Sequence, residues 1–157
     1  MNSKVKTVAL CFLALLAFAP PAAFAENVYT AVLLPSLVVP PSGENAYGTA
    51  TLIVADDGAL AALTVNFAGL EGAQTAAMLM DAPEGANGPV LLDLPLGTPV
   101  AIMVDMTPGI TAALADGDLA IQINNLDWPD GVLRGNFAWV TVATEEATWS
   151  AVKALFE

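Results

Sequence analysis

The strongest constraint on the fold is a series of short apolar runs that turn-forming residues separate. The runs are rich in β-branched and aromatic residues, which is typical of strands. Pro, Gly, Asn and Asp gather between them, where the chain must reverse. Roughly seven or eight such runs at this spacing predict an all-β protein, either an antiparallel sandwich or a barrel.

The clearest pair of strands flanks the tripeptide Asp56-Asp57-Gly58. Tyr47 to Val54 forms the first strand, and Ala59 to Phe67 returns beside it. An Asp-Gly pair tolerates the positive φ that tight hairpins need. Alternation along the returning strand assigns four side chains to the core: Ala61, Leu63, Val65 and Phe67.

The second half of the chain continues with strands and one short helix. Leu119 to Asn125 alternates and is predicted to be a strand, and Val132 to Ala143 is predicted to be the last one. Before them, Thr107 to Ala115 has Pro near its start and Gly117 just past its end. This arrangement favours one or two helical turns.

The C-terminal segment 144–157 has a helical pattern. Trp149, Val152 and Phe156 are spaced so that they form one narrow apolar stripe on a helix. Such stripes usually face a core, so we expect this helix to pack on the domain's own sheet. The alternative is a helix that docks onto a partner.

The N-terminal segment has the features of a secretory signal peptide. Lys4 and Lys6 precede an apolar run from Val8 to Phe18, and Ala23-Phe24-Ala25 is a small-x-small cleavage site. The apolar run is shorter than the ~20 residues of a membrane-spanning helix. We therefore predict a signal peptide at residues 1–25 with cleavage after Ala25, a secreted or periplasmic location, and no membrane span after cleavage. An uncleaved N-terminal anchor is the alternative. The domain itself is predicted to cover residues 26–143.

Removal of this segment makes the protein strongly acidic. It leaves two basic residues, Arg134 and Lys153, against sixteen acidic ones, which is a net charge of about −14. A nucleic-acid surface needs a track of basic side chains that neutralise phosphates. No nucleic-acid partner is therefore expected.

The inventory of reactive side chains argues against catalysis. The sequence has no His, and its one Cys, Cys11, lies inside the predicted signal peptide. Disulfides, zinc–thiolate sites and imidazole chemistry are thereby excluded from the predicted mature chain. No Ser lies in a Gly-x-Ser-x-Gly motif either. We predict that the protein is not an enzyme.

The stretch Thr75 to Asp81 is the strongest candidate for a chemical site. Met78 and Met80 are two residues apart, so on a strand both point to the same face. Thioethers select Cu(I), and Met103 and Met106 are candidates to complete such a set. Methionine is also an adaptable core residue, and packing is the simpler interpretation.

The turn after this stretch offers hard oxygen donors. Asp81 and Glu84, with the amide oxygen of Asn87 nearby, are the kind of ligands that Ca²⁺ prefers. The twelve-residue calcium-loop pattern is absent, and Asp, Asn, Gly and Pro are expected in any turn. A calcium site and plain turn chemistry are therefore both open.

Arg134 is one of the two basic residues outside the predicted signal peptide. Arginine readily pairs with carboxylates, and Asp127 and Asp130 are the nearest in sequence. The alternative is that Arg134 donates hydrogen bonds to turn carbonyls. In both cases its role is structural, and it is also a candidate binding residue.

The order of motifs from about Val28 to Phe137 resembles the CHRD (chordin-type) domain. This resemblance implies an immunoglobulin-like antiparallel β-sandwich of Greek-key type, found in secreted bacterial proteins and in animal chordins. The motifs are Tyr29-Thr30-Ala31-Val32-Leu33, Val39-Pro40-Pro41, Ala46-Tyr47-Gly48-Thr49-Ala50-Thr51-Leu52, Gly69-Leu70, Ala76-Ala77, Asn87-Gly88-Pro89-Val90, Ala115-Asp116-Gly117-Asp118-Leu119 and Pro129-Asp130-Gly131-Val132-Leu133-Arg134-Gly135.

This chain departs from the family pattern at its histidines. The family typically has Ala-His-Ile-His where this chain has Ala77-Met78-Leu79-Met80, and Asn-Val-His-Thr where it has Gln122-Ile123-Asn124-Asn125. Met78, Met80 and Asn124 thus stand at the imidazole positions, which makes all three candidate binding residues. Chemistry that depends on those histidines cannot be carried over.

The resemblance and the residue inventory together predict a non-enzymatic binding or structural module. In chordin-like proteins the setting is extracellular protein binding, so the expected partner is an extracellular or envelope protein. No cofactor is expected. The alternative is a metal-binding protein, with Cu(I) at Met78 and Met80 or Ca²⁺ at the acidic loops.

Overall fold

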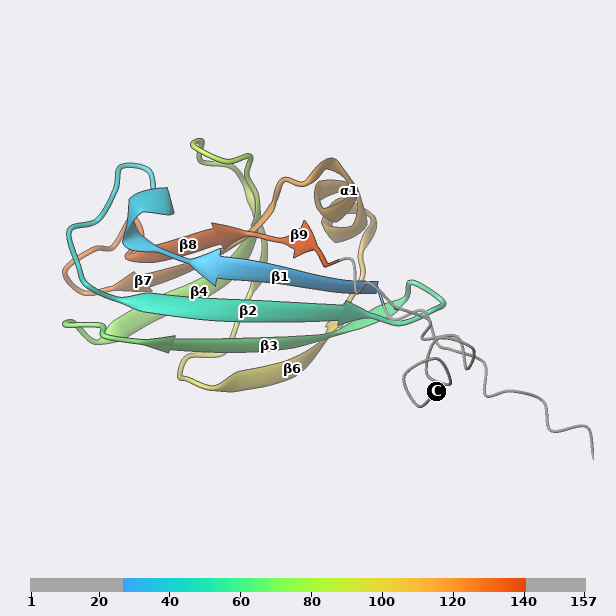
Figure 1. Ribbon diagram of the computed structural model, residues 1–157, viewed down its shortest axis with the longest axis horizontal. Coiled ribbons are helices and arrows are strands. Elements are labelled where there is room, and N and C mark those ends of the chain that lie inside the picture. The colour runs from blue at the N-terminus through green and yellow to red at the C-terminus, as the bar shows by residue number, and fades with distance from the viewer. Residues whose placement is uncertain (1–26, 141–157) are drawn as a thin grey trace, which may run out of the picture.

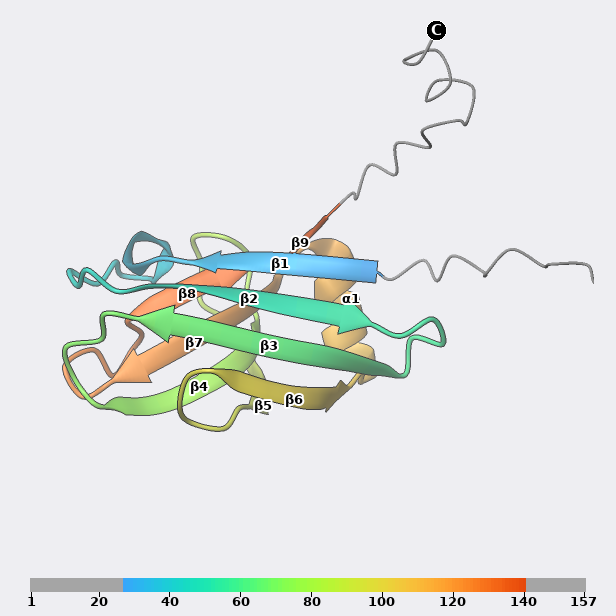
Figure 2. The same cartoon turned by 60° about the horizontal axis from the view of Figure 1, so that its bottom comes forward.

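A computed structural model describes residues 27–140 of the chain. It forms two antiparallel sheets packed face to face, as Figures 1 and 2 show. The five-stranded sheet has the order β6 (Val100–Asp105), β3 (Leu60–Ala68), β2 (Tyr47–Val54), β1 (Asn27–Leu33) and β9 (Ala138–Trp139). The four-stranded sheet has the order β5 (Val90–Asp93), β4 (Gln74–Asp81), β7 (Leu119–Asn125) and β8 (Leu133–Asn136). The prediction of an all-β antiparallel sandwich is confirmed.

The hairpin between β2 and β3 has the predicted form. Gly58 adopts φ 67°, and Asp57 Oδ1 accepts a hydrogen bond from the amide of Ala59. Ala61, Leu63 and Val65 are buried as predicted, while Phe67 is half-buried and packs against the core. The core lies between the inner faces of the two sheets, where alternate side chains of facing strands meet.

The predicted helical turn is α1 (Pro108–Asp116), which lies at one end of the sandwich (Figure 2). The Thr107 hydroxyl accepts a hydrogen bond from the amide of Ile110 and caps the helix. Gly117, at φ 81°, ends it in the left-handed conformation that glycine adopts without strain. A shorter 3₁₀ turn, η1 (Pro35–Leu37), follows β1.

The prediction of one last strand over Val132 to Ala143 is wrong. The chain forms β8 in the four-stranded sheet and then β9 in the five-stranded sheet. Phe137 lies at the crossing point, where its side chain is buried and its amide donates to the carbonyl of Leu119. β8 and β9 pair with strands of different sheets, so the chain passes from the four-stranded to the five-stranded sheet between them.

Several predictions concern residues outside the described range. They are the signal peptide at 1–25 and the C-terminal helix at 144–157, together with positions 26 and 141–143 of the predicted domain. Within residues 27–140, no helix has the length and apolar character required to cross a membrane.

Candidate functional site

The outer face of the four-stranded sheet is buried although it carries polar side chains. Met78, Gln122 and Arg134 lie side by side on β4, β7 and β8, because the strands pair at these positions. Met80 and Asn124 share this face, since each is two residues from one of the paired positions. We call these five residues the covered face. Met78 is half-buried, and the other four are buried.

The loop that covers this face is held by Arg134. The side chain is fully buried and donates hydrogen bonds to the carbonyls of Ala82 and Pro83, each at 2.8 Å, and to that of Ala86. Asn136 adds a bond from Nδ2 to the Ala82 carbonyl at 2.9 Å. The segment between β4 and β5 is thereby fixed over β7 and β8.

Arg134 therefore uses turn carbonyls, as one of the two alternatives predicted. The carbonyls belong to the turn after β4, and not to the Asp127–Asp130 turn that is nearest in sequence. Burial lowers the pKa of the guanidinium from its ordinary value, and the negative charge of Glu84 acts in the opposite direction. Glu84 thus stabilises the charged form of a cation that has lost its contact with water.

Gln122 and Asn124 form a chain of amide hydrogen bonds along β7. Asn124 Nδ2 donates to the Pro129 carbonyl at 2.7 Å, and Asn124 Oδ1 accepts from Gln122 Nε2 at 3.0 Å. Gln122 Nε2 also donates to the Asp130 carbonyl at 3.0 Å. The amide oxygen of Gln122, however, is buried and has no hydrogen-bond partner.

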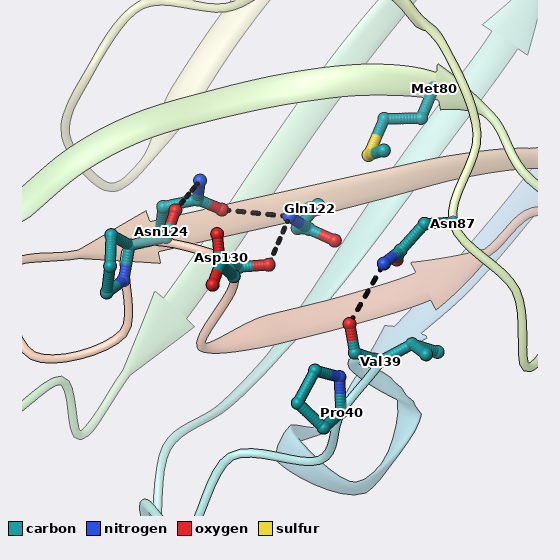
Figure 3. A pocket seen from close by; sticks show the side chains of 8 residues that line it. Val39, Pro40, Met80, Asn87, Gln122, Asn124 and Asp130 are labelled. Atoms are coloured by element: carbon teal, nitrogen blue, oxygen red, sulfur yellow. Dashed lines mark hydrogen bonds between the residues drawn. The ribbon is translucent and has the colours of Figure 1, made fainter.

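A pocket of about 310 Å³ opens beside this amide oxygen (Figure 3). In Figure 3 the oxygen points toward the side of the pocket where Asn87 lies. Asn87 reaches across from the covering loop, and its Nδ2 donates to the Val39 carbonyl at 3.0 Å. The pocket is lined by Val39, Pro40, Met80, Asn87, Gln122, Asn124, Pro129 and Asp130.

The turn after β7 leaves room for the Gln122 amide because it contains a glycine. Gly131 has φ 131°, and a Cβ there would lie 2.6 Å from Val38 Cγ1 and 3.0 Å from Gln122 Cδ. Asp130-Gly131 is therefore more than a chain reversal. Its glycine has no side chain, so the backbone packs directly against the Gln122 side-chain amide that lines the pocket.

The two methionines of the central candidate lie on the covered face, as their spacing predicted. Met80 is 6% exposed and lines the pocket, whereas Met78 is half-buried and packs against a small cluster of Met80, Ala82 and Ala120. Met103 and Met106 belong to the end of β6 and its neighbour, in the other sheet. The structure does not bring them to the covered face, where Met78 and Met80 lie.

The candidate calcium ligands lie where the covering loop begins. Asp81 is half-buried at the end of β4, and Glu84 is exposed in the following turn. Across the described residues, no group of three or more Asp, Glu, Cys or His side chains is arranged to hold a metal ion.

The sequence points to several residues that line the pocket, but not to Gln122. Met80 and Asn124 line the pocket, and Arg134 is paired on β8 with Gln122, which also lines it. Gln122 was not singled out, although it precedes Asn124 by two residues and so shares its face. The available signal is a polar pair at i and i+2 on a strand whose other polar residue, Asn125, lies at its end.

The fold and the covered face define a class of protein, a two-sheet antiparallel β-sandwich with a polar pocket on one outer face. The chain belongs to the CHRD domain family, whose model matches residues 29–137. The resemblance of the motifs between Val28 and Phe137 is confirmed by this match. Comparison with the curated proteins and with the solved structures gave no match.

Proposed function

We propose that this protein is a secreted or periplasmic binding module without catalytic activity, and that it binds its ligand in the pocket of the covered face. The observation that carries the proposal is the Gln122 amide oxygen, which is buried at the pocket without a partner. Buried polar atoms in folded proteins almost always have a partner, which is a protein group, a water or a ligand. A CHRD domain suggests a binding or structural module, and its expected partner is an extracellular or envelope protein.

A fragment screen by ¹H–¹⁵N NMR tests the position of the site. The full chain is titrated with a chemically diverse fragment set, and the side-chain amide signals of Asn87, Gln122 and Asn124 are followed. We expect at least one chemical class to shift these signals. Hits that shift only residues on the outer face of the five-stranded sheet would contradict the proposal.

Two matched variants control this screen. Asn87→Trp places a bulky side chain at an exposed position beside the pocket and is expected to block binding. Asn66→Trp makes the same change at an exposed position of β3, on the other sheet, and should leave binding unchanged. Equal effects of the two variants would argue against a ligand in this pocket.

The non-catalytic part of the proposal has its own test. The purified full chain is assayed against panels of ester, glycoside and peptide substrates. We expect no turnover above buffer, because the predicted mature chain has no His and no Cys. Hydrolysis that is lost in a Gln122→Met or Asp130→Asn variant would overturn this part.

Metal binding is the second candidate function, and the packing of Met78 against Met80 in one cluster favours it. Cu(I) is titrated against a chromophoric chelator with the full chain, a Met78→Leu/Met80→Leu double variant and Met103→Leu as control. Copper bound through the pair is lost only in the double variant. A parallel calorimetric titration with Ca²⁺, using Asp81→Asn and Glu84→Gln, tests the acidic loop. If the chain does not compete with the chelator for micromolar Cu(I) and gives no binding heat with micromolar Ca²⁺, both metal sites are ruled out.

A further inference from the structure

We propose that the C-terminal segment 144–157 docks as a helix in a groove at the α1 end of the sandwich, with the stripe of Trp149, Val152 and Phe156 facing the groove. Of the two alternatives that the amphipathic pattern leaves open, this one assigns the helix to the chain's own domain and to one place on it. No residue of the groove lines the pocket of the covered face, so the docking does not depend on the proposed function.

The groove lies where β1, β9 and the last turn of α1 meet, at one end of the sandwich (Figure 1). Its volume is about 470 Å³. Three of its residues also line a second hollow of about 210 Å³, so the two hollows adjoin. Adjoining hollows suit a helix, which presents side chains from successive turns along one line. The groove is lined by Tyr29, Leu114, Ala115, Asp116, Gly117, Phe137, Ala138 and Trp139.

The walls of the groove carry three aromatic side chains, and the largest of them is exposed. Trp139 is 62% exposed and belongs to a strand of two residues at the edge of the five-stranded sheet. It is paired with Tyr29 of β1, so the two side chains leave the sheet on the same face as neighbours. Phe137 and Leu114 are buried behind them. Exposed aromatic side chains at a hollow are typical anchors for an apolar partner.

The described part of the chain ends beside this groove. Val140 follows Trp139 directly, and its amide donates to the Val28 carbonyl at 2.9 Å. Eight residues, 141–148, then separate Val140 from Trp149. An extended chain spans about 3.3–3.6 Å per residue, so the stripe is well within reach of a groove that Trp139 itself lines. A tether of this length gives the segment an effective concentration on the order of millimolar, which favours it over a separate partner.

The charges of the groove and of the segment are complementary. α1 ends at the groove with Asp116 and has no basic residue in its last turn, so its negative dipole end lacks a cation of its own. On a helix, Lys153 follows Trp149 by four residues and therefore lies beside the stripe. The other basic residue of the predicted mature chain is Arg134, which is bonded to the covering loop. Docking brings Lys153 to Asp116 and the carboxyl end of α1.

Paramagnetic relaxation tests the docked position on the full chain. Cys11→Ser removes the one native cysteine, and Ser150→Cys then carries a nitroxide beside the stripe. We expect the ¹H–¹⁵N signals of Leu114 and Gly117 to lose most of their intensity, and to regain it when ascorbate reduces the nitroxide. Ser36→Cys is the matched control, because it is exposed in η1 at the opposite end of the sandwich (Figures 1 and 2), and its nitroxide should leave these signals unchanged.

A pair of substitutions in the same nitroxide-labelled chain examines the stripe. Phe156→Ser removes a side chain of the stripe and should restore the groove signals. Leu155→Ser makes the same kind of change about 100° away around the helix and should leave the broadening in place. Equal effects of the two substitutions would overturn the stripe as the contact. If Phe156→Ser does not fold, the nitroxide at position 150 of the otherwise unaltered segment decides.

Three further outcomes would overturn the docking. Groove signals that stay sharp mean that the segment does not occupy the groove. Broadening at Met103 or Gln122 in place of the groove signals would put the segment on an outer face of the sandwich. The third is broadening of equal strength when nitroxide-labelled ¹⁴N chain is mixed with ¹⁵N chain that carries no nitroxide, since the occupant would then be a second copy of the chain.

Discussion

The two outer faces of the sandwich differ in what covers them, although alternating strands form both. On the five-stranded sheet, Thr30, Thr49, Thr64 and Met103 are exposed, and we call them the open face. On the four-stranded sheet the corresponding positions are the covered face, where the loop between β4 and β5 lies over them. Polar residues point outward in both cases, but only one face loses its contact with water.

The comparison shows that strand alternation decides which face a side chain joins, and that a distant loop decides whether the face is buried. A buried polar side chain must find partners, and the covered face supplies them through backbone carbonyls. The open face needs no such partners. The covered face is therefore the part of the molecule where side chains are held rigidly enough to recognise a ligand.

The largest expected effect is the loss of the Arg134 side chain. Arg134→Met removes a donor from three carbonyls of the covering loop, of which only that of Ala82 keeps another one, from Asn136, and should lower the free energy of unfolding by about 3–5 kcal/mol. Urea denaturation measures this as a lower midpoint at an unchanged slope. Arg134→Lys keeps the charge but not the planar fork, so an intermediate loss is expected. A loss below about 1 kcal/mol would mean that this arginine behaves as a surface residue.

A second substitution, at Gly88, is expected to displace the covering loop at its other end, near β5. A Cβ at Gly88 would collide with the carbonyl oxygen of Asp81, which is backbone and cannot move aside. We expect Gly88→Ala to cost about 2–4 kcal/mol and to increase hydrogen exchange at the Gln122 and Arg134 amides. Gly85→Ala is the matched control in the same loop. It has φ 78° and open space around it, so it should cost only about 1 kcal/mol.

The sequence predicted those parts of the fold that depend on neighbouring residues. The β2–β3 hairpin follows from alternation around Asp56-Asp57-Gly58, and α1 follows from Thr107, Pro108 and Gly117. The change of sheet at Phe137 was missed, because it depends on which strands are nearby and no local pattern marks it.

The candidate site was predicted in its members but not in its environment. Met80 is a candidate because of its spacing from Met78 on a strand, and Asn124 because it stands at a histidine position of the CHRD pattern; the two do lie together at the pocket. Met80 packs with Ala82, at the start of the loop that Arg134 holds through carbonyls at Ala82, Pro83 and Ala86, about fifty residues earlier in the chain. Contacts of such sequence separation leave no periodic signal in either segment.

The same substitution on both faces makes the comparison quantitative. Met80→Ala removes a side chain that is 6% exposed and should cost about 2–3 kcal/mol, since it leaves a cavity under the loop. Met103→Ala removes one that is 62% exposed on the open face and should change stability by less than about 0.5 kcal/mol. Parallel urea titrations of the two variants measure these losses of unfolding free energy. Equal losses would mean that the loop does not seal the covered face in solution.

The smallest expected effect concerns the charge above the covered face. Glu84→Gln removes the negative charge that raises the pKa of Arg134, so this pKa falls further and the charged guanidinium is less stabilised in the folded state. Glu84 is exposed, and screening limits the loss of unfolding free energy to about 0.5 kcal/mol or less. The difference from the unaltered chain should shrink between low salt and about 1 M salt, where the screening length is about 3 Å. Glu71→Gln, an exposed control that does not perturb Arg134, should show no such salt-dependent difference. A salt-independent loss at Glu84 would place its effect in loop packing, and the buried arginine would then be stabilised by its carbonyl contacts alone.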